Sequence, residues 1–90
     1  MTGLKIGVVG VGALGRHHAR ILAQLPNVEL VAVADTNGDT GRSVAASCGT
    51  RWIADYRELC GQVDAVSIAV PTTAHLSVAT AFLSRRIATL

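Results

Sequence analysis

Aromatic and clustered basic residues are scarce in this chain of 90 residues. It has one Trp, one Tyr and one Phe, too few for a platform on which nucleic-acid bases could stack. The eight Lys and Arg residues are scattered along the chain and the net charge is only +2, so no basic stripe matches a phosphate backbone. We therefore expect no nucleic-acid partner.

Cysteine is also rare. Cys48 and Cys60 lack the C-x-x-C spacing of a redox or zinc motif, and their number is too low for a secreted disulfide scaffold. Each precedes a glycine at an expected helix end. We therefore interpret both as small unpaired thiols near helix C-termini, in a protein of a reducing compartment. Together with three histidines they form no metal-ligand pattern, so we expect no metal site and a cytoplasmic protein.

Long uninterrupted apolar runs are absent. Residues 65–84 contain no Asp, Glu, Lys or Arg, but Pro71 and several polar residues divide them into a strand and a helix. The apolar stretch after Lys5 is interrupted by glycines and has no cleavage site, so it is not a signal peptide. The sequence predicts no membrane partner.

Half of the residues are hydrophobic, and short apolar segments alternate with amphipathic ones. This alternation predicts right-handed crossovers and an α/β fold with a Rossmann-like, doubly wound parallel sheet, βαβαβαβαβ, incomplete at the C-terminus. Residues 1–90 would form one domain. The expected strands are an apolar run around Ile6–Val9 and segments 29–34, 51–54, 64–70 and 87–90, and the expected helices are 13–25, 38–48, 55–60 and 72–86.

Apolar spacing also predicts which helix faces point inward. For the first helix the expected inward residues are Leu14, His18, Ile21 or Leu22, and Leu25; for the second they are Val44, Ala45 and Ala46; for the last they are Ala74, Val78, and Ala81 or Phe82. Asp55 and Glu58 have the spacing of a capping box, a structural role.

The stretch KIGVVGVGALGR carries glycines in G-x-G-x-x-G spacing. Gly10 would allow a tight turn from strand to helix, Gly12 would let a pyrophosphate approach the main chain, and Gly15 would let the helix pack close to the strand. The free backbone N–H groups at the helix start would face the anion. The motif alone is weak evidence, because glycine turns also serve purely structural purposes.

Asp35 follows Gly15 by 20 residues and ends an apolar strand. A dinucleotide-binding fold places at about this interval the acid that hydrogen-bonds the adenosine ribose. The alternative is an Asp that caps the next helix or turn. Because the carboxylate would repel a 2′-phosphate and Thr36, not Arg, follows it, NAD is favoured over NADP. Arg42 is the one nearby cation that could change this preference. We expect Gly15 and Thr36, like Asp35, to belong to the cofactor-binding site.

The segments KIGVVGVGALGRHHARIL and VDAVSIAVPTTAHLSVATAFL, the latter with Pro71 and His75 in a P-x-x-x-H pattern, resemble the N-terminal domain of the Gfo/Idh/MocA oxidoreductases. The resemblance implies binding of NAD or NADP and hydride transfer to or from a sugar, inositol or nucleotide-sugar. By position, it implies that Gly10, Val11, Gly12, Ala13 and Leu14 contact the pyrophosphate, that Asp35 contacts the ribose, and that Val70, Pro71, Thr72 and His75 line the wall from adenosine to nicotinamide.

Members of that family continue into a Glu-Lys-Pro motif and a second α/β domain with an Asp and a His, and this sequence contains neither. The resemblance therefore implies a cofactor-binding half without catalytic residues, with a sugar-like substrate only in a full-length protein. Apolar faces left for a missing half would favour self-association.

The histidines are the only candidates for proton transfer near neutral pH. We expect His18 to be packed and hydrogen-bonded, His17 to face solvent, and His75 to lie at a helix start beside the cleft.

Two other functions stay open: an NAD-sensing module without catalysis, and an S-adenosylmethionine-dependent methyltransferase, against which the complete glycine motif argues.

Overall fold

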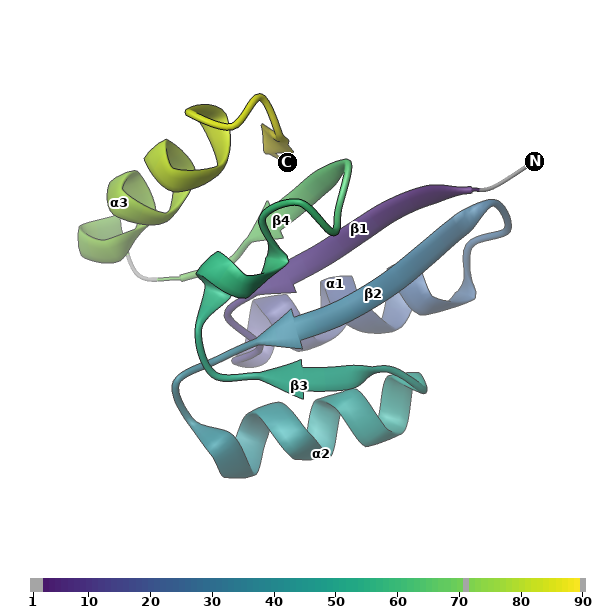
Figure 1. The fold of residues 1–90 in the computed structure, drawn as a ribbon. Coiled ribbons are helices and arrows are strands. Elements are labelled where there is room, and N and C mark those ends of the chain that lie inside the picture. The colour runs from purple at the N-terminus through teal and green to yellow at the C-terminus, as the bar shows by residue number, and fades with distance from the viewer. Residues whose placement is uncertain (1–2, 71, 90) are drawn as a thin grey trace.

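The computed structural model describes residues 3–70 and 72–89 and contains one parallel sheet flanked by helices (Figure 1). The sheet has five strands in the order β3-β2-β1-β4-β5, and every pairing is parallel. This confirms the Rossmann-like α/β prediction. The elements are β1 (Leu4–Val9), α1 (Ala13–Gln24), β2 (Val28–Ala34), α2 (Gly38–Cys48), β3 (Arg51–Ile53), the 3₁₀-helix η1 (Tyr56–Leu59), β4 (Ala65–Ile68), α3 (Thr72–Leu83) and β5 (Ala88–Thr89).

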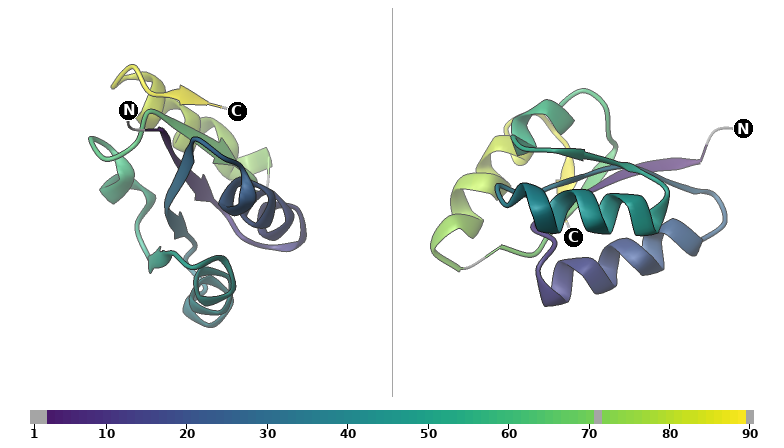
Figure 2. Two further views of the ribbon diagram at one scale, coloured as in Figure 1. Left: turned by 90° about the vertical axis from the view of Figure 1, so that its right-hand side faces the viewer. Right: turned by 90° about the horizontal axis from the view of Figure 1, so that it is seen from below.

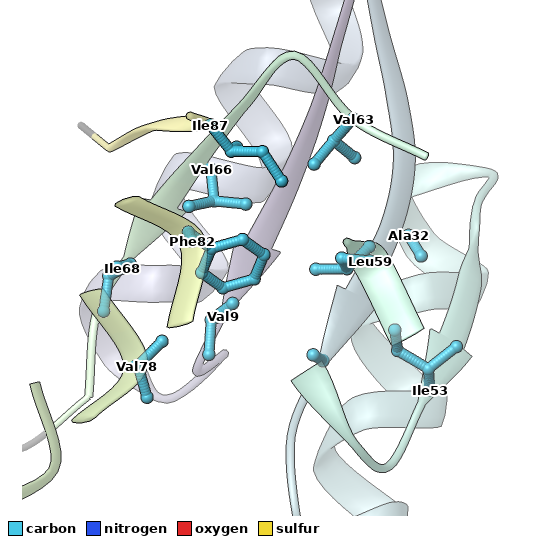
Figure 3. Packing of buried hydrophobic residues seen from close by; sticks show 11 residues of the cluster. Val9, Ala32, Ile53, Leu59, Val63, Val66, Ile68, Val78, Phe82 and Ile87 are labelled. Atoms are coloured by element: carbon cyan, nitrogen blue, oxygen red, sulfur yellow. The ribbon is translucent and has the colours of Figure 1, made fainter. Parts of the chain in front are cut away.

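The sheet buries both faces, as expected for strands of near-continuous apolar sequence. On one face α1 and α2 cover a cluster formed by Val8, Val11, Ala19, Val33, Val44 and Ala45. On the other face α3 and η1 cover a larger cluster in which Phe82 and Leu59 are fully buried (Figure 3). Neighbouring residues of one strand, such as Val8 and Val9, serve opposite clusters because strand side chains alternate.

The inward face of α1 differs from the prediction. Leu14, Ile21 and Leu25 are 59, 43 and 44% exposed, whereas the buried residues are Gly15 and Ala19. His18 and Leu22 are half-buried. The helix approaches the sheet so closely that small residues occupy the contact, and the large apolar residues lie at its margins.

The buried faces of α2 and α3 agree better with the prediction. Val44 and Ala45 are buried in α2, although Ala46 is exposed, and Val78 and Phe82 are buried in α3. Helix α3 ends at Leu83, short of the expected Arg86, whose φ of 59° ends any helical continuation.

The segment after β3 forms only one 3₁₀ turn, and the predicted capping box is wrong. The Asp55 carboxylate accepts from the N–H of Arg57, and the N–H of Glu58 donates to the Asp55 carbonyl instead. A 3₁₀ turn is too tight for the side-chain geometry of an α-helical capping box.

No helix among the described residues is both long and apolar enough to cross a membrane.

Candidate cofactor-binding site

The glycine turn joins β1 to α1 at the carboxyl edge of the sheet. Gly10 has a φ of 86°, a conformation that residues with side chains rarely adopt, and its N–H donates to the Ala34 carbonyl at the end of β2 (2.7 Å). A Cβ at Gly15 would lie against the Gly10 carbonyl oxygen, far closer than the 3.0 Å that real Cβ contacts keep. A Cβ at Gly12, by contrast, would meet nothing within 4 Å. Gly10 and Gly15 therefore shape the turn, and Gly12 leaves open space above it.

The N-terminus of α1 faces this open space without a cap. Gly12 provides no side-chain hydrogen bond, and the first turn holds no acidic residue. Within the described residues, the N–H groups of Ala13, Leu14 and Gly15 have no acceptor. Unpaired N–H groups at the positive end of a helix form a favourable site for an anion.

Asp35 lies directly beside the turn and is half-buried. One carboxylate oxygen accepts from the N–H of Val11 (2.9 Å), and the other accepts from the N–H of Asn37 (2.8 Å). Asp35 therefore has the structural role considered as the alternative. A carboxylate has about four lone-pair sites, so two of them stay available to hydroxyl donors. The two roles are compatible.

A cleft of about 400 Å³ connects these features. It lies between the glycine turn, the ends of β2, β3 and β4, and the first half of α3, and most of its lining is apolar. The lining residues are Val9, Gly10, Gly12, Ala34, Asp35, Thr36, Ala54, Tyr56, Ala69, Val70, Ala74 and Val78. Its position, outside the carboxyl ends of strands where their order reverses at β1, is where open α/β sheets bind ligands.

Five of the residues expected to bind the cofactor line this cleft: Gly10, Gly12, Asp35, Thr36 and Val70. Val11 and Gly15 are buried beneath the turn, whereas Ala13 and Leu14 are exposed at the helix start. His75 lies in an adjoining hollow of about 320 Å³ that also contacts Val70. Thr72 begins α3, its side chain lies outside the described part of the chain, and so does Pro71.

Sequence reasoning missed Tyr56. Its half-buried ring forms part of the cleft wall and packs against Phe82, with ring centroids 5.9 Å apart and an angle of 46° between the planes. The only indication in the sequence was its place just after β3, whose carboxyl end belongs to the same sheet edge.

Arg42 does not line the cleft. Its guanidinium lies over the Trp52 ring, 4.8 Å from the centroid, and 3.8 Å from the Asp39 carboxylate. Trp52 in turn donates its indole N–H to the Asp35 carbonyl (2.9 Å). The nearest candidate partner for a 2′-phosphate therefore packs on α2 and β3.

The histidines lie outside the cleft. His18 Nδ1 is 3.0 Å from the hydroxyl of Ser67, which confirms the expected hydrogen-bonded packing. His17 is exposed and accepts a hydrogen bond from Arg20 (3.0 Å). Among residues 3–70 and 72–89, no three His, Cys, Asp or Glu side chains lie together as a metal site would require.

The sequence profile of the Gfo/Idh/MocA proteins, described as an oxidoreductase family with an NAD-binding Rossmann fold, matches residues 4–90. The chain belongs to this family. The match confirms the NAD-binding role and the cofactor predicted from the resemblance, and it sets the methyltransferase alternative aside.

Individual relatives agree with this assignment. UDP-N-acetylglucosamine 3-dehydrogenase of Acidithiobacillus ferrooxidans is 40% identical over 79 residues, which are 88% of this chain and 25% of that protein. A solved structure of that enzyme has a TM-score of 0.91 and 37% identity, covering 100% of this chain and 29% of the other. Inositol 2-dehydrogenase 1 of Saccharopolyspora erythraea is 40% identical over 83 residues, 87% of this chain and 25% of that protein.

GenD2 from gentamicin A biosynthesis, solved in complex with NAD, has a TM-score of 0.92 and 27% identity, covering 99% of this chain and 26% of the other. The chain spans about a quarter of the length of the curated relatives it matches.

Proposed function

We propose that the cleft binds NAD, with the pyrophosphate at the N-terminus of α1 and the adenosine ribose at Asp35. The observation that carries this proposal is the juxtaposition of an uncapped helix N-terminus and a carboxylate with spare lone pairs in one cleft of about 400 Å³. The open space at Gly12 fits the approach of a phosphate to the main chain. Tyr56 and Val70 would form apolar walls.

NAD fits this site better than NADP. The Asp35 carboxylate would repel a 2′-phosphate, and Arg42, which could neutralise it, is engaged with Trp52 and Asp39. A cation in the loop after Asp35 would weaken the preference for NAD, but the residues that follow Asp35 are the uncharged Thr36 and Asn37.

We further propose that residues 1–90 act as the dinucleotide-binding domain of a protein that transfers hydride to or from a sugar, inositol or nucleotide-sugar. The names of the UDP-N-acetylglucosamine and inositol dehydrogenases support this substrate class. NAD, when bound, supplies the hydride acceptor or donor. The chain's own cleft residues bind and orient it, and Asp35 is engaged in hydrogen bonds to the backbone. We therefore assign proton transfer to a further domain.

Two smaller proposals accompany this function. The two cysteines, which are unpaired within the described residues, fit a cytoplasmic location. Leu76 and Leu83, 76 and 57% exposed on α3, favour self-association when no other domain covers them.

Titration with NAD and NADP, monitored by thermal unfolding, tests the cofactor assignment. A ligand at 100 times its Kd stabilises the folded state by about 2.7 kcal/mol. Asp35→Asn keeps the size of the side chain but removes its charge, and loss of charged hydrogen bonds to the ribose should weaken NAD about 10-fold to 100-fold. Because the same substitution removes the repulsion between the Asp35 carboxylate and a 2′-phosphate, the affinity for NADP should rise relative to the affinity for NAD.

Glu58→Gln is the matched control, since it removes one exposed carboxylate outside the cleft. It should leave the Kd for NAD unchanged. Equal NAD affinity in the wild type and Asp35→Asn would contradict the role of Asp35, and no stabilisation by NAD of the folded wild type would contradict the assignment of the cleft.

A further inference from the structure

A second hollow, of about 250 Å³, lies between α1 and α2 and shares no lining residue with the cofactor cleft. Figure 2 shows these two helices side by side, with the purple-blue α1 next to the teal α2. Its lining residues are Arg16 and Arg20 from α1, and Ser43, Val44, Ser47 and Cys48 from α2.

The α1 side of this α1–α2 groove is positively charged. Arg16 and Arg20 lie one helical turn apart, and the sequence of α1, ALGRHHARILAQ, contains no acidic residue. Within the described residues neither arginine is paired with a carboxylate; Arg20 donates to the His17 ring instead. Like charges at this spacing destabilise a helix, and Arg16 near the N-terminus opposes the helix dipole. Helix stability therefore does not account for the pair.

The α2 side supplies hydroxyl groups. Ser43 and Ser47 lie one turn apart, and the Ser47 hydroxyl donates to the Ser43 carbonyl (3.1 Å). In the part of the chain that the structure describes, the Ser43 hydroxyl has no partner. The groove lining holds two arginines and two serines and no acidic residue, a composition that matches the needs of an oxyanion. Arginine forks bind phosphate oxygens in pairs.

We propose that the α1–α2 groove binds a phosphate group, either free phosphate or the phosphate monoester of a small metabolite. The site is separate from the pyrophosphate position at the start of α1, so it does not depend on the proposed cofactor.

Cys48 lines the groove and reports on its charge. Iodoacetate and iodoacetamide alkylate the same thiolate but differ in charge, so the ratio of their rates measures local attraction for anions independently of thiol ionisation. Cys60, half-buried after η1 and outside the groove, is the control within the same protein. At low ionic strength the ratio should be about fivefold higher at Cys48 than at Cys60, and it should collapse in 1 M salt, where the screening length is about 3 Å.

The double variant Arg16→Gln/Arg20→Gln should lower the ratio at Cys48 to that at Cys60. In the wild type, millimolar inorganic phosphate should slow alkylation of Cys48 by iodoacetamide several-fold, and it should have no such effect in the variant. Glucose 6-phosphate in place of phosphate distinguishes a monoester from the free ion, and succinate at equal ionic strength distinguishes phosphate from carboxylate recognition. Stabilisation by NAD should be the same in the wild type and in the double variant.

Equal ratios at the two cysteines of the wild type would overturn the proposal, and this measurement needs no variant. Protection by succinate alone would overturn the phosphate assignment. Loss of NAD stabilisation in the double variant would show that the groove belongs to the cofactor site.

Discussion

The glycines of the turn provide a test in which stability and cofactor binding separate. Gly15 faces the Gly10 carbonyl oxygen with no room for a Cβ, whereas a Cβ on Gly12 would meet no atom within 4 Å. Gly12 has φ −67° and ψ −157°, an extended conformation that alanine also adopts. The same substitution, Gly to Ala, should therefore act through different mechanisms three residues apart.

Gly15→Ala should be strongly destabilising. The new methyl group collides with backbone, which does not rotate away as a side chain would, so the start of α1 must recede by more than an ångström. Overpacking of this kind costs about 3 kcal/mol at the upper end of the usual range. For a domain of this size that corresponds to a fall in Tm of roughly 12 to 24 °C.

Gly12→Ala should leave the free energy of unfolding within about 0.5 kcal/mol of the wild type. Alanine is a poorer N-cap than glycine, which lowers the stability of the folded state. It also reduces the conformational entropy of the unfolded chain, and this stabilises the folded state by about 0.4 to 1 kcal/mol and offsets the loss. Its methyl group would occupy the space through which a pyrophosphate approaches, so NAD stabilisation should disappear.

Urea unfolding followed by the fluorescence of Trp52, the chain's one tryptophan, measures stability, and the shift in Tm with NAD measures binding. The reasoning is refuted if Gly12→Ala binds NAD like the wild type, or if Gly15→Ala unfolds at the same urea concentration as the wild type.

Three further predictions concern the rest of the fold. His18→Leu removes the partner of the 5% exposed Ser67 hydroxyl and should cost about 1 to 3 kcal/mol in urea unfolding without changing NAD affinity; an unchanged midpoint would contradict the role of this bond. The Arg57 guanidinium beside Asp55 lowers the pKa of that carboxyl below 3.8, so the bond stabilises the fold above pH 3.8 and is lost as pH falls through the lowered pKa. Arg57→Gln should return this pKa toward 3.8 in an NMR titration, and a pKa that stays low would refute the assigned cause. Phe82→Ala, at a fully buried position, should cost about 3 to 5 kcal/mol, and a loss below 1 kcal/mol in calorimetry would argue against the packing in Figure 3.

The alternation of elements was predictable because it depends on local patterns. Strands such as Val28–Ala34 are short, β-branched and apolar, and turn residues separate them from the helices. Gly49, which follows Cys48 and has a φ of 68°, caps the end of α2 as the sequence predicts, whereas Gly61 lies in the turn after η1, whose cap is Cys60.

The orientation of α1 was not predictable from apolar spacing, because that spacing counts large side chains. The close approach of Gly15 to Gly10 sets the distance between helix and strand, and at this distance only small residues such as Ala19 fit between them. Leu14 is then left exposed at the start of the helix. The glycine motif itself contained this information, since its third glycine indicates close packing.

Tyr56 was missed for a different reason. Its place in the cleft depends on the parallel pairing of β2 with β3, which brings the end of β3 beside Asp35, and on Phe82, which comes from a distant helix. Such contacts are set by tertiary structure, and no spacing within residues 51–60 encodes them.

Asp35 shows why the two interpretations of a motif residue need not compete. Its carboxylate connects the glycine turn to the loop before α2 through the N–H groups of Val11 and Asn37, so it fixes the shape of the site in which it would also contact a ribose. Removal of the whole side chain would therefore disturb the cleft and the contact together, and a loss of NAD binding in Asp35→Ala would not distinguish them. The change to Asn keeps one acceptor oxygen for the backbone while it removes the charge. Only the preference between NAD and NADP then isolates the contact, because a distorted cleft weakens both dinucleotides, whereas a lost charge weakens one and favours the other.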